Sequence, residues 1–151
     1  MGFLRSGAIE FQAFEVAERN QYRIFEFNAW LTEQQILRAL DDCAGLTADG
    51  LLPLPVLVGL SFSGIHHARL RAFPRAKVIS EEYGEHSLTV TPILINAWDA
   101  DANTRVRRMF DELYQNFGSS RCPNYDQNGE RMWLGENHDP APAPPRQHWR
   151  W

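Results

Sequence analysis

The side chains that could do acid–base or metal chemistry in this sequence are histidines and loop carboxylates. His66 and His67 are adjacent, His86 lies further along, and Asp99 and Asp101 follow an apolar run. Histidines on neighbouring strands with a nearby aspartate can form a hydrolytic or metal site. The sequence contains no HExxH and no close ligand spacing. A hydrolase or metal enzyme is therefore our third hypothesis; we assign no catalytic residue, no metal and no cofactor, and favour a non-enzymatic protein.

A row of cations in a predicted strand could contact phosphates. Alternate strand residues share a face, and an aromatic ring among cations can stack on a base. The candidate residues are Arg69, Arg71, Phe73, Arg75 and Lys77, within the basic strand 67–77. In the alternative interpretation, the arginines pair with nearby carboxylates such as Glu81, Glu82 and Glu85. The net charge of −4 favours that alternative, so nucleic-acid binding is our second hypothesis.

The triplet NAW occurs twice, each time after a predicted strand and before a predicted helix. The first copy holds Asn28 and Trp30, and the second holds Asn96 and Trp98. Equivalent loops converge in a two-layer fold, where Asn and Trp can bond to and stack on a flat ligand. Asn also ends strands and Trp closes cores, and we weigh this structural interpretation above binding.

The C-terminal residues form the most specific candidate contact surface. Residues 139–145 read DPAPAPP, which predicts an extended, polyproline-like segment. Trp149, Arg150 and Trp151 then end the chain. Two tryptophans in water would expose a large apolar area, so we expect them to dock on the domain or in a partner. Trp and Arg are enriched at interface hot spots.

Two amphipathic helices must position these residues. In the second, predicted over 104–117, the apolar side chains recur at helical spacing: Val106, Met109, Phe110, Leu113 and Phe117. For the first helix, Thr32 and Gln35 predict a capping box, and Gly45 predicts the C-terminal end. Strands are predicted over 22–27, 56–61, 67–73, 77–83 and 86–97, with Pro92 marking an edge or a bulge.

These elements predict an α+β fold in one domain, residues 1–134, followed by a Pro-rich tail, residues 135–151, ending in RQHWRW. We expect a two-layer sandwich, a mainly antiparallel sheet covered by two helices, of ferredoxin-like or related type. Two cysteines without a C-x-x-C pair and no membrane-length apolar run indicate a cytoplasmic protein with no membrane partner. Our leading hypothesis is a small interaction or regulatory module that binds a protein partner or itself, as a homodimer.

Overall fold

The computed structural model describes residues 25–72, 80–126 and 128, together with the backbone of three short strands, β1 (Gly2–Phe3), β2 (Ile9–Glu10) and β3 (Ala17–Arg19). The later elements are β4 (Phe25–Asn28), α1 (Ala29–Ala48), β5 (Val56–Ser63), β6 (Arg69–Arg71), β7 (Ser87–Ile95) and α2 (Ala100–Asn116). This mixture confirms the predicted α+β class. Phe73, Arg75, Lys77 and the predicted tail with Trp149, Arg150 and Trp151 lie outside the described residues.

The strands pair mainly antiparallel. β1 pairs with β2 and β3 with β4, both antiparallel, while β4 and β6 are parallel. The longest pairing joins β5 to β7, from Val56↔Ile95 to Ser63↔Ser87, with a register shift between Val58 and Leu60. The shift lies opposite the segment that holds Pro92, as the sequence predicted, because proline cannot donate to the ladder.

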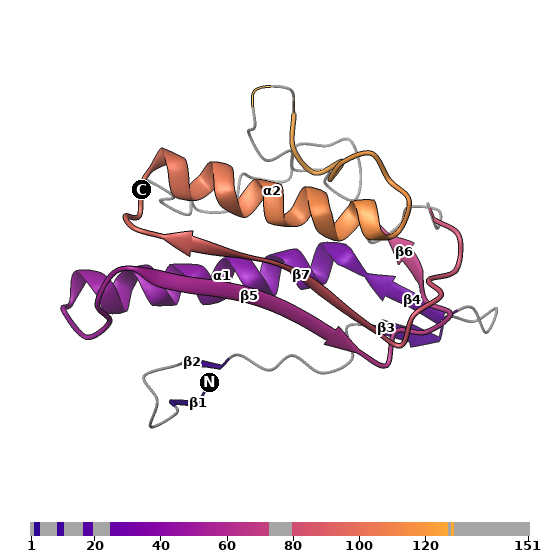
Figure 1. The fold of residues 1–151 in the computed structure, drawn as a ribbon, viewed down its shortest axis with the longest axis horizontal. Coiled ribbons are helices and arrows are strands. Elements are labelled where there is room, and N and C mark those ends of the chain that lie inside the picture. Colours follow the sequence, from indigo (N-terminus) through magenta and orange to yellow (C-terminus); the bar gives the residue numbers. More distant parts are fainter. Residues whose placement is uncertain are drawn as a thin grey trace, which may run out of the picture.

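The β5–β7 pairing continues through a bend toward β6. The amide of Gly64 donates to His86, that of His67 donates to Tyr83, and that of Tyr83 donates to Ala68, each at 2.9 Å. Residues 56–71 therefore run beside residues 80–95 as one long, bent hairpin, of which β5 and β7 form the straight arm (Figure 1). Figure 1 also shows α2 lying along β7, with α1 running in the opposite direction behind the hairpin.

One hydrophobic core joins both helices to the strands. It includes Phe27 of β4, Leu70 of β6, Ile95 of β7, and Phe110 and Leu113 of α2, all fully buried. The apolar stripe predicted for the second helix is confirmed, because all five of its side chains are buried. Within the described residues, neither helix combines the length and the apolar character that crossing a membrane requires.

Both helices begin earlier than predicted. α1 is capped by Asn28, whose Oδ1 accepts from the amide of Leu31 at 3.2 Å, so the predicted capping box at Thr32 is wrong. Thr32 lies in the first turn and donates to the carbonyl of Asn28. Gly45 is inside the helix, since the left-handed residue that follows this helix is Gly50, at φ 72°. α2 is capped by Asp99, and Gly118, at φ 83°, follows its end.

Candidate functional site

The straight hairpin arm, β5 with β7, carries the most exposed apolar surface among the described strands. The alternation of β5 places Val56, Val58, Leu60 and Phe62 toward the helices and the other four residues toward solvent. On the outer face, Leu57 is 68% exposed and Leu94, its cross-strand partner, is 41% exposed. Neither β5 nor β7 contains a charged residue. The arm therefore presents an uncharged, partly apolar ribbon.

The two long edges of this ribbon differ. At the edge of β7, the amide and the hydroxyl of Thr91 both donate to Oε1 of Glu112 on α2, at 2.9 and 2.8 Å. At the edge of β5, the described part of the chain supplies no further strand, because β5 pairs there with β7 alone. β5 forms the lower rim of the ribbon in Figure 1. Natural edge strands usually carry a charge, a proline or a cover that blocks further pairing, and β5 carries no charge.

Burial of the inward-facing side chains confirms this asymmetry. Leu88, Val90 and Ile95 of β7 are buried, with exposures of 4% or less, and Ile93, the partner of Val58, is half-buried. The four inward residues of β5 are only half-buried, although Val58, Leu60 and Phe62 pack against the same core. The hydrophobic layer is thus more completely covered at β7 than at β5.

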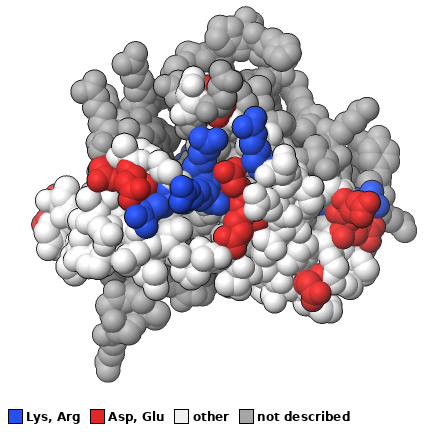
Figure 2. Space-filling model, turned by 45° about the horizontal axis from the view of Figure 1, so that its top comes forward, with Lys and Arg blue, Asp and Glu red and all other residues white. Residues whose placement is uncertain are grey.

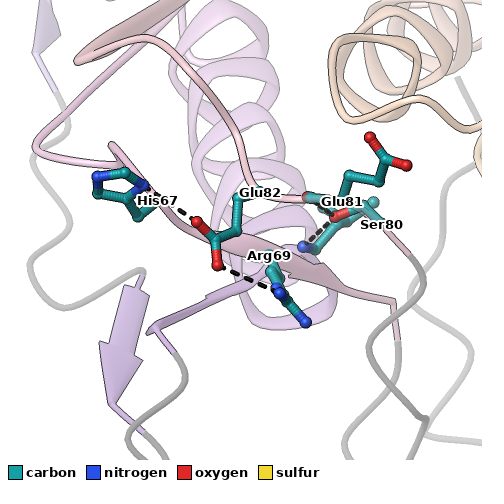
Figure 3. A network of polar contacts seen from close by, with 6 residues as sticks. His67, Arg69, Ser80, Glu81 and Glu82 are labelled. Atoms are coloured by element: carbon teal, nitrogen blue, oxygen red, sulfur yellow. Dashed lines mark hydrogen bonds and ion pairs between the residues drawn. The ribbon is translucent and has the colours of Figure 1, made fainter.

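A second cluster lies at the bend of the hairpin, where the ring of His66 stacks on that of His86 and lies tilted against that of His67. The ring centroid of His66 lies 3.8 Å from that of His67 and 4.3 Å from that of His86. Nδ1 of His67 is 3.1 Å from Oε2 of Glu82, and Arg69 donates to the other oxygen of Glu82 at 3.2 Å (Figure 3). Figure 3 also shows Ser80 beside these residues; its hydroxyl accepts from the amide of Leu70 at 2.7 Å. The bend thus gathers residues that the sequence places up to twenty positions apart.

The charges of this cluster act on one another. Hydrogen bonds from Arg69, and secondly from His67, lower the pKa of Glu82. Partial burial, followed by the charges of His67 and His86, lowers the pKa of His66. Asp99, which the sequence grouped with these histidines, instead accepts from two amides at the start of α2. In the described part of the chain, no group of three or more His, Cys, Asp or Glu side chains is arranged to hold a metal ion.

The described cations of the basic strand are engaged by carboxylates. Ala68, Leu70 and Ala72 are buried, so Arg69 and Arg71 lie on the opposite face, as predicted. Arg69 pairs with Glu82 as the alternative interpretation expected, and Nη1 of Arg71 lies 3.2 Å from Oε2 of the buried Glu26. On the face shown in Figure 2, basic and acidic groups lie next to one another and leave much of the lower surface uncharged.

The two NAW segments have different structural roles. In the first, Asn28 is the helix cap and Trp30 is a buried residue of α1. In the second, Asn96 is exposed, Trp98 is half-buried, and the cap is the following residue, Asp99. The β4–α1 and β7–α2 junctions also lie at opposite ends of the molecule (Figure 1). The two segments do not converge on one site, contrary to the expectation of equivalent loops.

A buried polar network lies between the two helices, and sequence reasoning missed it. Oε1 of Glu33 accepts from the hydroxyl of Tyr114 at 2.7 Å and from Nδ2 of Asn124 at 2.6 Å, and the thiol of Cys122 lies 3.5 Å away. These four residues are at most 1% exposed. Burial, and secondly the charge of Glu33, raises the pKa of both Tyr114 and Cys122. The detectable signal was a glutamate within the apolar stripe of α1, one turn before Leu37.

Comparison with protein-family models, with curated proteins and with solved structures found no match to this chain.

Proposed function

We propose that this protein is a small interaction module that binds a protein partner, or a copy of itself, through the outer edge of β5. The observation that carries this proposal is the asymmetric ribbon, on which three of the four inward side chains of β7 are buried and all four of β5 are only half-buried. Adding one strand beside β5 would cover those side chains and pair the edge. Proteins use such strand addition for recognition, with main-chain hydrogen bonds supplying affinity and alternate side chains supplying specificity.

Two other functions receive less support. Nucleic-acid binding would use Arg69 and Arg71, but both pair with carboxylates, and breaking those pairs would oppose phosphate binding. A hydrolase could use His67, held by Glu82 as a base is held by a carboxylate, yet both side chains are at least half exposed, at 65% and 50%. Water surrounding such a pair weakens the electrostatic stabilisation that catalysis requires.

Two finer features belong to the same proposal. We propose that the strands and both helices form a two-layer sandwich of ferredoxin-like or related type; the shared core of α1, α2 and the inward side of β7 supports this arrangement. The tail with Trp149, Arg150 and Trp151 is a second proposed contact surface. A partner that contacts both surfaces would bind more tightly, because the two surfaces are joined in one chain and binding at one raises the effective concentration at the other.

Hydrogen exchange in dilute solution tests whether the edge of β5 is open. Alternate amides of a strand point to opposite edges, so an open edge gives fast exchange at every second residue of 56–63 and slow exchange at the others, which bond to β7. We expect this alternation in the dilute full chain, resolved amide by amide. Uniform protection along β5 in a dilute sample that sedimentation shows to be monomeric would contradict the proposed function, because the edge would then be closed by the chain itself.

A further inference from the structure

The direction of each amide along β5 follows from two contacts on β7. The amide of Thr91 donates to Glu112 on α2 and so points away from β5, and the amide of Thr89, two residues earlier, shares that direction. The hydroxyls of Ser61 and Thr89, which are cross-strand partners, lie only 2.9 Å apart. Side chains approach most closely at the pairs that exchange no backbone hydrogen bonds. Ser61 therefore directs its N–H and C=O toward the open edge, and by alternation so do Leu57, Gly59 and Ser63.

The open edge is bounded on both sides. Pro53 and Pro55 precede β5 and lack the N–H that a ladder needs. Gly64 follows it with φ 70°, a left-handed conformation that ends the extended run. The usable edge is therefore residues 56–63, with outward-directed groups at positions 57, 59, 61 and 63, centred on Leu60.

We infer that the strand added to β5 is the β5 of a second copy, paired antiparallel about a twofold axis at Leu60; this inference rests on the proposed function. An axis at Leu60 places 57 opposite 63 and 59 opposite 61, so every outward-directed residue meets another. Each such pair exchanges two hydrogen bonds. An axis moved by one residue, to Gly59, leaves Ser63 opposite Pro55, which cannot donate. The register centred on Leu60 therefore forms more backbone hydrogen bonds along the β5 edge than the register centred on Gly59.

The same register pairs side chains of matching character. On the inward face, Val58 meets Phe62 of the second copy and Leu60 meets its own copy, and these are the half-buried side chains that β7 leaves uncovered. Cross-strand pairs of an aromatic with a β-branched side chain are favourable. On the outer face, the exposed Leu57 meets Ser63 of the second copy.

Charge and chain composition favour a second copy over other occupants. β5 contains no charged residue, so two copies meet without local repulsion, and a charged partner strand would gain no ion pair with it. The tail is a poor alternative strand, because four of the seven residues in DPAPAPP are prolines without an N–H. The interface is closed by its symmetry, which limits assembly to a dimer rather than a fibre.

The first test uses the outward amide of Ser61. Ser61→Pro removes that donor and inserts a ring into the interface while sparing the ladder to β7, and Ser61→Thr is the matched control that keeps both amide and hydroxyl. Sedimentation of the full chain over a dilution series should show a reversible dimer. We expect Ser61→Pro to raise the dimer dissociation constant by at least about tenfold. Ser61→Thr should leave it within about twofold.

The second test reads the register and does not depend on Ser61→Pro folding. Mild oxidation should give a covalent dimer of Leu60→Cys, because that residue faces its own copy at a spacing that a disulfide can span. Leu57→Cys, on the same strand, faces Ser63 and should remain uncrosslinked; the native cysteines are both buried. Equal crosslinking of the two variants, or a dimer of Ser61→Pro as tight as the wild type, would overturn the inference. A wild-type monomer at every concentration with alternating amide exchange along β5 would overturn this inference alone, whereas uniform protection in that monomer would overturn the proposed function as well.

Discussion

Glu33 shows how a single buried residue joins the two helices. Its oxygen receives hydrogen bonds from Tyr114 of α2 and from Asn124 in the segment after α2, and Asn124 also donates to the Tyr114 hydroxyl at 3.0 Å. A buried carboxyl oxygen is costly unless such donors surround it. The network consequently fixes the register of α1 against α2, which apolar contacts alone specify less strictly.

Removing one donor should reveal the strength of this network. We expect Tyr114→Phe to lower the free energy of unfolding by about 1–3 kcal/mol, because Glu33 and Asn124 each lose a partner in a site without water contact. Urea denaturation measures the change. Tyr83→Phe is the control, since the Tyr83 hydroxyl donates to Ser87 at an exposed position and its loss should change stability by no more than about 0.5 kcal/mol. Equal losses in the two variants would mean that the buried hydrogen bonds of Tyr114 stabilise the fold no more than the exposed one of Tyr83.

The histidine cluster should make stability depend on pH. The pKa of His66 is lowered by partial burial and by His67 and His86, which outweigh the opposing charges of Glu85 and Glu82. The unfolded chain therefore binds a proton at higher pH than the folded chain does. The contribution of His66 to folding stability is present above the unfolded pKa of 6.5 and is lost as pH falls through the folded pKa.

We accordingly expect denaturation midpoints to fall as pH is lowered from about 7.5 to about 5.5, where only histidines among the side chains normally titrate. His66→Gln should show a smaller fall over the same range. Glu82 acts in a lower window, because its lowered pKa contributes stability above its usual 4.5 that is lost as pH drops through the folded value. If His66→Gln kept the wild-type dependence of stability on pH, His66 would not be the group responsible for the fall.

At the scale of elements, the two NAW triplets give a matched comparison. Asn28 caps α1, whereas Asn96 is followed by the same Ala-Trp pair and lies exposed before the Asp99 cap. Asn28→Ala should destabilise the protein by about 0.5–2 kcal/mol, as loss of a cap does. Asn96→Ala should stay within about 0.5 kcal/mol of the wild type. Thermal unfolding of the two variants side by side measures the difference, and comparable losses would show that the triplet, not the cap, is what matters.

Periodicity predicted the elements better than their ends or their partners. The stripe from Val106 to Phe117 predicted α2 because burial repeats with the helical period, and the apolar run from Val56 predicted β5. The helix starts were misplaced because Asn28 and Thr32 are both good caps, and local sequence does not say which is used. The parallel pairing of β4 with β6 and the contact of Glu33 with Asn124 join residues more than forty positions apart, which no local pattern reports.

At the scale of the whole molecule, the charged residues lie apart from the proposed contact surface. The net charge is −4, yet neither strand of the ribbon carries a charge, and the described cations of β6 are held in ion pairs away from it. An assembly formed through β5 therefore depends on backbone hydrogen bonds and apolar contact. Salt acts on it only through the long-range repulsion between two acidic copies.

This separation predicts an unusual response to ionic strength. Raising salt from about 50 mM to about 500 mM shortens the Debye length from roughly 14 Å to roughly 4 Å and so screens the repulsion between copies. The dimer should hold its dissociation constant or tighten by up to about threefold, because no ion pair across the interface is lost. A dimer joined through Arg69 and Arg71 would instead weaken, since its ion pairs would be screened. Sedimentation at the two salt concentrations distinguishes these cases, and marked weakening would place the contact at the arginines of β6, away from the β5 edge.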